Sequence, residues 1–147
     1  MHNDSNNLGY LLNKSTKMLK NKFNDKLKEF DLTLSQWSVL RDVYSQELSD
    51  KELKDISPAS VAQRLYINRP TMSGIMDRLL KKGWIIATTN QNDRRSQIIS
   101  LTEKSKNLMI ELDELGDDVV ELAVQGFTES EIMQLKAYLS RIIKNLL

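Results

Sequence analysis

The chain has 147 residues, 40% of them hydrophobic and 28% charged, and a formal net charge of +1, which together predict one compact globular unit. It shows no leader-like start and no apolar run of about 18 residues, so we expect a cytoplasmic protein without a membrane partner. Cysteine is absent, which excludes disulfides, thiolate metal sites and thiol switches, and with His2 as the single histidine we expect no enzyme, metal site or cofactor.

The first predicted helix spans about residues 8–30, after a polar stretch that contains His2. Lysines occupy most of its sides, and we interpret them as a solvated face, with contacts between some of them and DNA backbone as the alternative. The remaining side is apolar at helical spacing. Its residues are Leu8, Leu11, Leu12, Leu19, Phe23, Leu27 and Phe30.

A second helix is predicted to begin after Thr33. Thr33 as N-cap and Gln36 three residues later form a capping-box pattern, and Leu32 is placed to pack against Trp37 across the first turn. The polar residues 45–55 predict a loop. Ile56, which follows them, is a candidate for a short third strand beside a later hairpin.

Two short helices come next, separated by a tight turn at residues 66–67. Each begins with a capping residue and a proline in the first turn, Ser57 with Pro58 and Asn68 with Pro70, where the missing N–H costs nothing. Gly83, after two lysines, predicts the end of the second helix. That helix carries an apolar stripe that is predicted to face inward, made of Met72, Ile75, Met76, Leu79 and Leu80.

Residues 84–89 and 96–101 are typical of two strands, with a polar loop at residues 90–95 between them. Helix, turn, helix and basic hairpin form the architecture of a winged helix-turn-helix DNA reader. The charge distribution agrees, because residues 57–96 carry seven basic and two acidic side chains while residues 97–147 carry five and nine. One basic segment predicts a surface that meets a polyanion; chance clustering on a solvated surface is the alternative.

Two amphipathic helices complete the chain. Thr102 is placed to cap the first, whose apolar residues follow a heptad-like seam until Gly126 and Phe127 interrupt it. Thr128 and Glu131 form a second capping box before the last helix. These helices are more apolar than a small DNA-reading unit requires. We therefore expect the first and last helices to pack together and against a second copy, with an intrachain bundle as the alternative.

Several segments resemble the MarR-type transcription regulators. The run from Arg69 to Gly83 is similar to that family's recognition helix. Asp93 and Arg95, followed by a strand and a Leu-Thr pair, are similar to its wing, and the helix entry at Thr33 is also similar. The resemblance implies a dimer that binds DNA, and in many members a small aromatic or amphipathic effector.

We therefore predict a mainly α fold with a small β-hairpin wing. Residues 33–102 are expected to form a winged helix-turn-helix DNA-binding domain, and residues 1–32 and 103–147 a helical dimerisation region. The predicted function is that of a homodimeric transcription regulator, a repressor, that recognises a pseudo-palindromic operator in double-stranded DNA and is released or modulated by a small molecule. A winged-helix adaptor for protein contacts, or an activator without a ligand, is the alternative.

The predicted DNA-binding residues lie on the two short helices and the wing. Arg95 is expected to enter the minor groove, Arg94 to meet phosphate, and Asp93 to hold the loop or the arginine. Arg69 can read guanine. Gly74 either lets the helix backbone approach DNA closely or is a chance sequence variation within the family. The set is Gln63, Arg64, Asn68, Arg69, Pro70, Thr71, Ser73, Gly74, Arg78, Lys81, Asp93, Arg94 and Arg95.

A second group of residues is placed between the DNA-reading unit and the dimerisation helices, where the resemblance implies an effector cleft. For each of them, packing in the protein core is the alternative. These residues are Tyr10, Phe23, Trp37, Tyr44 and Met109.

Overall fold

The computed structural model describes residues 6–49 and 56–147. These residues form six α-helices, one short 3-10 helix and one two-stranded sheet, which confirms the predicted mainly α fold with a β-hairpin wing. His2 and residues 50–55 of the predicted loop lie outside the described part. The elements are α1 (Leu8–Leu27), η2 (Lys28–Phe30), α2 (Leu34–Ser49), α3 (Pro58–Arg64), α4 (Arg69–Lys81), β1 (Ile85–Thr89), β2 (Gln97–Leu101), α5 (Glu103–Ala123) and α6 (Glu129–Leu146).

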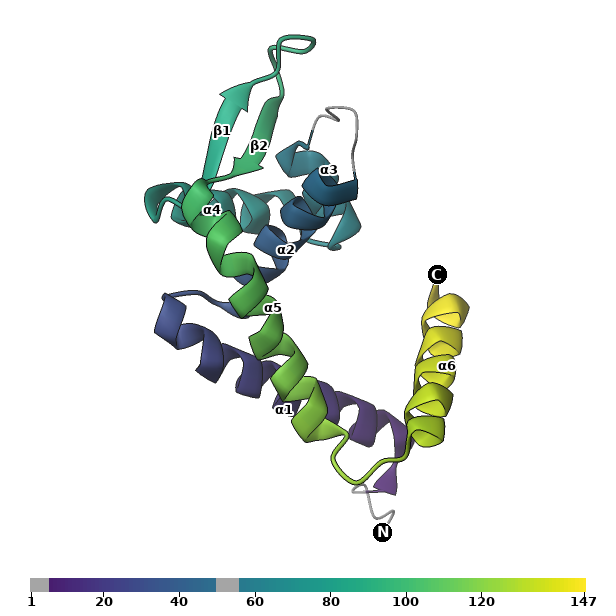
Figure 1. Ribbon diagram of the computed structural model, residues 1–147. Helices are drawn as coiled ribbons and strands as arrows, with labels where there is room; N and C mark the ends of the chain where they lie inside the picture. The colour runs from purple at the N-terminus through teal and green to yellow at the C-terminus, as the bar shows by residue number, and fades with distance from the viewer. Residues whose placement is uncertain (1–5, 50–55) are drawn as a thin grey trace.

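The elements form three parts along the molecule (Figure 1). Helices α2, α3 and α4 gather beneath the hairpin, α1 and α5 cross below them, and α6 stands to one side. Helix α1 packs on α5, while α2 contacts α1, α3, α4, α5 and β2. Helix α2 therefore touches both the crossed helices α1 and α5 and the unit formed by α3, α4 and the hairpin.

The predicted helix starts are built as the sequence indicates. Thr33 and Gln36 form a reciprocal capping box, in which each side-chain oxygen lies 3.2 Å from the other residue's backbone nitrogen. Gly83 follows α4 with a φ of 73°, the left-handed conformation expected after a helix end. The starts of α3, α4, α5 and α6 are capped by Ser57, Asn68, Thr102 and Thr128.

The prediction of a loop from residue 45 is wrong for residues 45–49, which form the last turn of α2. A tertiary contact explains the extension, because Oε1 of Glu47 accepts a hydrogen bond from the backbone nitrogen of Leu101 at 2.9 Å. This bond fixes the end of α2 against β2. The polar composition of residues 45–49 does not indicate this contact with β2.

The hairpin has the predicted strands to within one residue, and Ile85 pairs with Leu101 and Thr89 with Gln97. The carbonyl of Ile56 accepts a hydrogen bond from the Ile99 nitrogen at 2.7 Å, so Ile56 lies beside β2 as predicted, although it forms no strand in the described residues. With the Glu47 contact, this bond covers part of the outer edge of β2.

The core lies between α2, α4, the hairpin and the start of α5. Four residues of the predicted α4 stripe are buried, but Leu80 is 38% exposed, so its predicted inward position is wrong. Successive residues of a helix are about 100° apart, which turns Leu80 away from the buried Leu79 towards the wing. Among the largest fully buried side chains are Leu40, Val43, Val61, Leu79, Ile99, Met109 and Leu112.

Helix α6 buries none of its residues within the described chain. Its apolar side is uncovered, so the alternative of an intrachain bundle is not what the structure shows. On α5, Leu112 and Val119 are buried against the chain while Leu122, near the end of the predicted seam, is 54% exposed. No helix in residues 6–49 or 56–147 is both long and apolar enough to cross a bilayer.

Candidate nucleic-acid interface

Helix α4 presents a polar face opposite its buried stripe. The side-chain oxygen of Asn68 accepts a hydrogen bond from the Thr71 nitrogen at 2.9 Å and so fixes the start of the helix. Because the buried stripe attaches α4 to the core, the opposite face is free to meet a partner. The predicted residues on that face are Arg69, Pro70, Thr71, Ser73, Arg78 and Lys81, all exposed.

The wing tip is a loop held by its own hydrogen bonds. Oδ1 of Asp93 accepts from the backbone nitrogen of Arg95 at 3.0 Å, and the Asp93 carbonyl accepts from the Ser96 nitrogen at 3.0 Å. At the base of the loop, Oδ1 of Asn90 accepts from the Asn92 nitrogen at 2.8 Å. Asp93 therefore holds the loop backbone, while the Arg94 and Arg95 side chains project into solvent.

A cavity of about 620 Å³ separates α4 from the wing and the start of α3. It brings four predicted residues to one place: Arg69 and Ser73 from α4, and Asp93 and Arg95 from the wing. Thr71, Gly74 and Arg78 do not line this cavity. The structure thus places α4 and the wing side by side, with charged groups between them.

The basic side chains of this surface are largely unpaired. In the described part of the chain, none of Arg69, Arg78, Lys81, Arg94 and Arg95 takes part in an ion pair, and all are exposed. The two other basic residues of segment 57–96 are paired, Lys82 with Asp31 at 3.3 Å and Arg64 with Asp42 at 2.7 Å. Within segment 57–96, the positive charge that has no ion-pair partner therefore lies on α4 and the wing tip.

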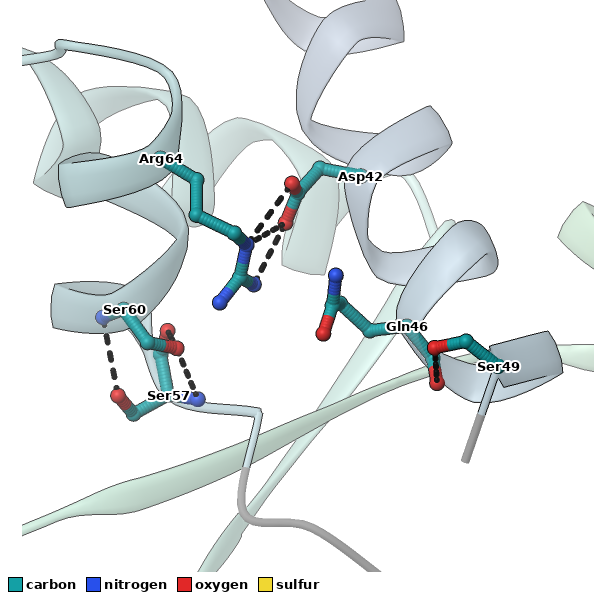
Figure 2. Close-up of polar contacts among 6 residues, drawn as sticks. All are labelled: Asp42, Gln46, Ser49, Ser57, Ser60 and Arg64. Atoms are coloured by element: carbon teal, nitrogen blue, oxygen red, sulfur yellow. Dashed lines mark hydrogen bonds and ion pairs between the residues drawn. The ribbon is translucent and has the colours of Figure 1, made fainter. Parts of the chain in front are cut away.

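Arg64 is engaged within the protein. Its Nε lies 3.0 and 3.2 Å from the two carboxylate oxygens of Asp42, and a second guanidinium nitrogen lies 2.7 Å from Oδ2 (Figure 2). The Asp42 carboxylate thus competes with DNA phosphate for the Arg64 guanidinium. Gln63, beside Arg64, is exposed. The sequence does not single out Asp42, because no local pattern connects residues that are 22 positions apart.

Gly74 is not required by packing inside the chain. A Cβ added there would meet only the Arg78 guanidinium, at 3.9 Å, which is ordinary contact. Gly116 on α5 differs, because its Cβ would lie 3.2 Å from the ring of Phe23 and 3.6 Å from that of Trp37. Of the two, only Gly116 lies in close contact with side chains of other helices.

These two glycines give a matched pair of substitutions. Gly74→Ala should raise the free energy of unfolding by about 1 kcal/mol, because alanine is the better helix former. Gly116→Ala should lower it, because the displaced Phe23 costs more than the helix gains. Urea unfolding of the two variants and the parent chain measures both. Equal changes of the same sign would contradict the packing difference.

The predicted effector residues separate into two groups. Phe23, Trp37, Tyr44 and Met109 belong to or pack on the single core cluster, and the rings of Phe23 and Trp37 lie 5.7 Å apart. Tyr10 is 41% exposed and is not in that cluster. Packing in the core is enough to explain the positions of the first four residues. The binding of an effector by these residues therefore has no direct support and stays a prediction.

Comparison with known proteins gives consistent results. A model of the MarR family matches residues 32–97. The transcriptional regulator SarZ of Staphylococcus aureus is 31% identical over 143 residues, which cover 97% of this chain and 85% of SarZ.

Solved structures share the fold. The S. aureus MepR–DNA complex aligns with a TM-score of 0.82 at 24% identity, covering 99% of both chains. A mutant of E. coli MarR bound to operator DNA aligns with a TM-score of 0.81 at 23% identity, covering 97% of both chains. The regulator SlyA aligns at 0.78 and 27% identity over 92% of this chain and 90% of its own.

Proposed function

This chain belongs to the MarR family of transcription regulators, and we propose that it binds duplex DNA as a homodimer through α4 and the wing. Membership in a family of regulators also confirms the predicted class, a transcription regulator and not an enzyme. The observation that carries the DNA proposal is the set of five exposed cations without ion-pair partners on α4 and the wing tip. Two solved structures with the same fold, those of MepR and of a MarR mutant, are complexes with DNA, which supports DNA binding by this chain.

Each element has a distinct part in the proposed contact. Helix α4 enters the major groove with Arg69, Thr71 and Ser73 near its start, supported by Asn68 and Pro70. Arg78 and Lys81 meet phosphate, and Gly74 gives the backbone room to approach. Arg95 enters the minor groove and Arg94 meets phosphate, while Gln63 on α3 meets the DNA backbone.

The dimer proposal rests on α6. Its apolar residues repeat at helical spacing and have no covering surface in the described chain, which is unfavourable for a helix in water. Packing of α6 against α1 and α6 of a second copy would bury them. Two heads related by a two-fold axis then read a pseudo-palindromic operator.

We further propose that the protein represses transcription and that a small aromatic or amphipathic molecule modulates its binding by changing the distance between heads. An activator without a ligand is the second possibility for this surface. A protein adaptor has no use for unpaired cations on both α4 and the wing, so the charge favours DNA.

Selection of bound duplexes from a random pool tests the proposal directly. We expect an enriched sequence with two inverted half-sites. Five candidate cations per head, of which about half touch phosphate, give a slope of log K against log salt concentration near −4 to −5. No enrichment, or an affinity that does not change with salt, would contradict DNA binding by this surface.

The two reading elements should fail in different ways. Arg69→Ala is expected to relax preference at one base pair per half-site and to cost about 1–3 kcal/mol, because it removes a base contact. Arg95→Ala should weaken binding while leaving the preferred sequence nearly unchanged, because a wing arginine responds to groove shape and charge. Selection repeated with each variant measures the difference. Equal losses on all sequences from both variants would reduce Arg69 to a phosphate contact.

A further inference from the structure

The ion pair of Asp42 and Arg64 differs from the other pairs among the described residues. Its shortest distance, 2.7 Å, is the smallest of them, and only 11% of the Asp42 side chain and 35% of the Arg64 side chain are exposed. Two guanidinium nitrogens meet both carboxylate oxygens, a geometry that fixes the relative orientation of the two groups. The hydrogen bond to Asp42 raises the pKa of Arg64.

The pair joins α2 to the last residue of α3 (Figure 2). In that view Arg64 and Asp42 face each other across the space between the helices, and the side chain of Gln46, one turn further along α2, lies beside them. The turn between α3 and α4 is also bonded to α3, because the Ile67 nitrogen donates a hydrogen bond to the Ala62 carbonyl at 2.9 Å. The turn that leads into α4 is thus tied to α3, and Asp42 ties the end of α3 to α2.

The residue before Asp42, Arg41, connects α2 to α5 instead of α3. Arg41 lies over the Trp37 ring at 5.2 Å, and its Nε is 3.8 Å from Oδ1 of Asp113 on α5. Two consecutive residues of α2 therefore point to α5 and to α3. Because they are about 100° apart around the helix, any rotation of α2 changes both contacts together.

From this geometry we propose that Asp42 is a positioning residue for DNA recognition. It holds Arg64, and through α3 the start of α4, in the orientation in which Arg69 meets the bases. Arg64 is then a structural partner of Asp42 and not a phosphate contact. The proposal rests on the DNA-binding function proposed above.

The two roles of Arg64 predict opposite effects of Asp42→Asn. If Arg64 contacted phosphate, removing the carboxylate would free the guanidinium and remove a negative charge near DNA, so binding would tighten and its salt slope would steepen. If Asp42 positions α3 and α4, the same change weakens specific binding and leaves the salt slope unchanged. The direction of the affinity change decides between them.

The test uses the full-length protein and a duplex selected by it from a random pool. We expect Asp42→Asn and Arg64→Lys each to weaken binding to that duplex on the order of tenfold, with little change on a duplex of scrambled sequence. Arg64→Lys keeps the charge but not the two-pronged geometry, so a phosphate contact would survive it. Asp25→Asn is the matched control, because Asp25 near the end of α1 forms an exposed pair with Lys28 at 3.1 Å.

The outcomes separate this proposal from the function on which it rests. If the parent protein selects no duplex, DNA binding itself fails. If the parent binds and Asp42→Asn binds equally well or more tightly, the positioning role fails. Thermal unfolding accompanies each measurement, and loss of the folded state in both variants would reduce the pair to a stability element and overturn the proposal as well.

Discussion

Replacement of Leu139 by glutamate is expected to convert the proposed dimer into monomers and to abolish specific DNA binding. Leu139 lies on the apolar side of α6 with Leu135 and Ile142, and it is 41% exposed in the single chain. A carboxylate on a surface that a second copy must bury should cost association about 4 kcal/mol or more, roughly a thousandfold. Sedimentation or light scattering gives the mass, and a binding titration gives the affinity.

Ser140→Glu is the matched control, since it adds the same charge to the next residue, on a polar side of α6. It should remain dimeric and bind DNA. Because the core includes no residue of α6, both variants should keep the helical signal of the remaining chain. A dimeric Leu139→Glu protein at micromolar concentration would show that α6 is not the dimer surface.

Insertion of about 5 bp between the two half-sites should have the second large effect. Half a turn of DNA rotates one half-site to the opposite side of the duplex, so that only one head can bind. We expect a loss of about a thousandfold or more, to the level of non-specific DNA. Titration of the parent protein on the original and the lengthened duplex measures it.

A duplex with about 10 bp inserted is the informative control. It restores the rotation but moves the half-sites apart by one turn, roughly 34 Å. If α1, α5 and α6 fix the distance between heads, this insertion should restore little affinity. Full recovery would indicate heads joined flexibly, and equal affinity on all three duplexes would mean that the heads act independently.

Features encoded by neighbouring residues could be predicted from the sequence. The caps of α3 and α4, the left-handed Gly83 and the hairpin all follow from local patterns, because each is made by residues a few positions apart. The cluster of cations on α4 and the wing follows from the sequence in the same way, because its members lie within one short basic segment.

Features made by distant residues could not be predicted. The Asp42–Arg64 pair and the Glu47–Leu101 bond join residues 22 and 54 positions apart, so neither the engagement of Arg64 nor the true end of α2 has a local signal. Tyr66 is a local exception, since the sequence predicts a turn there but not its left-handed φ of 54°. The apolar side of α6 can be recognised in the sequence. That α6 does not pack into the core of its own chain cannot.

The isolation of α6 makes its structure depend on protein concentration. An 18-residue helix without packing partners is only marginally stable in water, so in the proposed dimer α6 gains its stability from the second copy. Its amide hydrogens should therefore exchange more slowly as the protein is concentrated, while those of α2 and α4 exchange at a constant rate. The abundance of the protein in the cell would then set how many chains carry a formed α6, and with it how many paired heads are available to DNA.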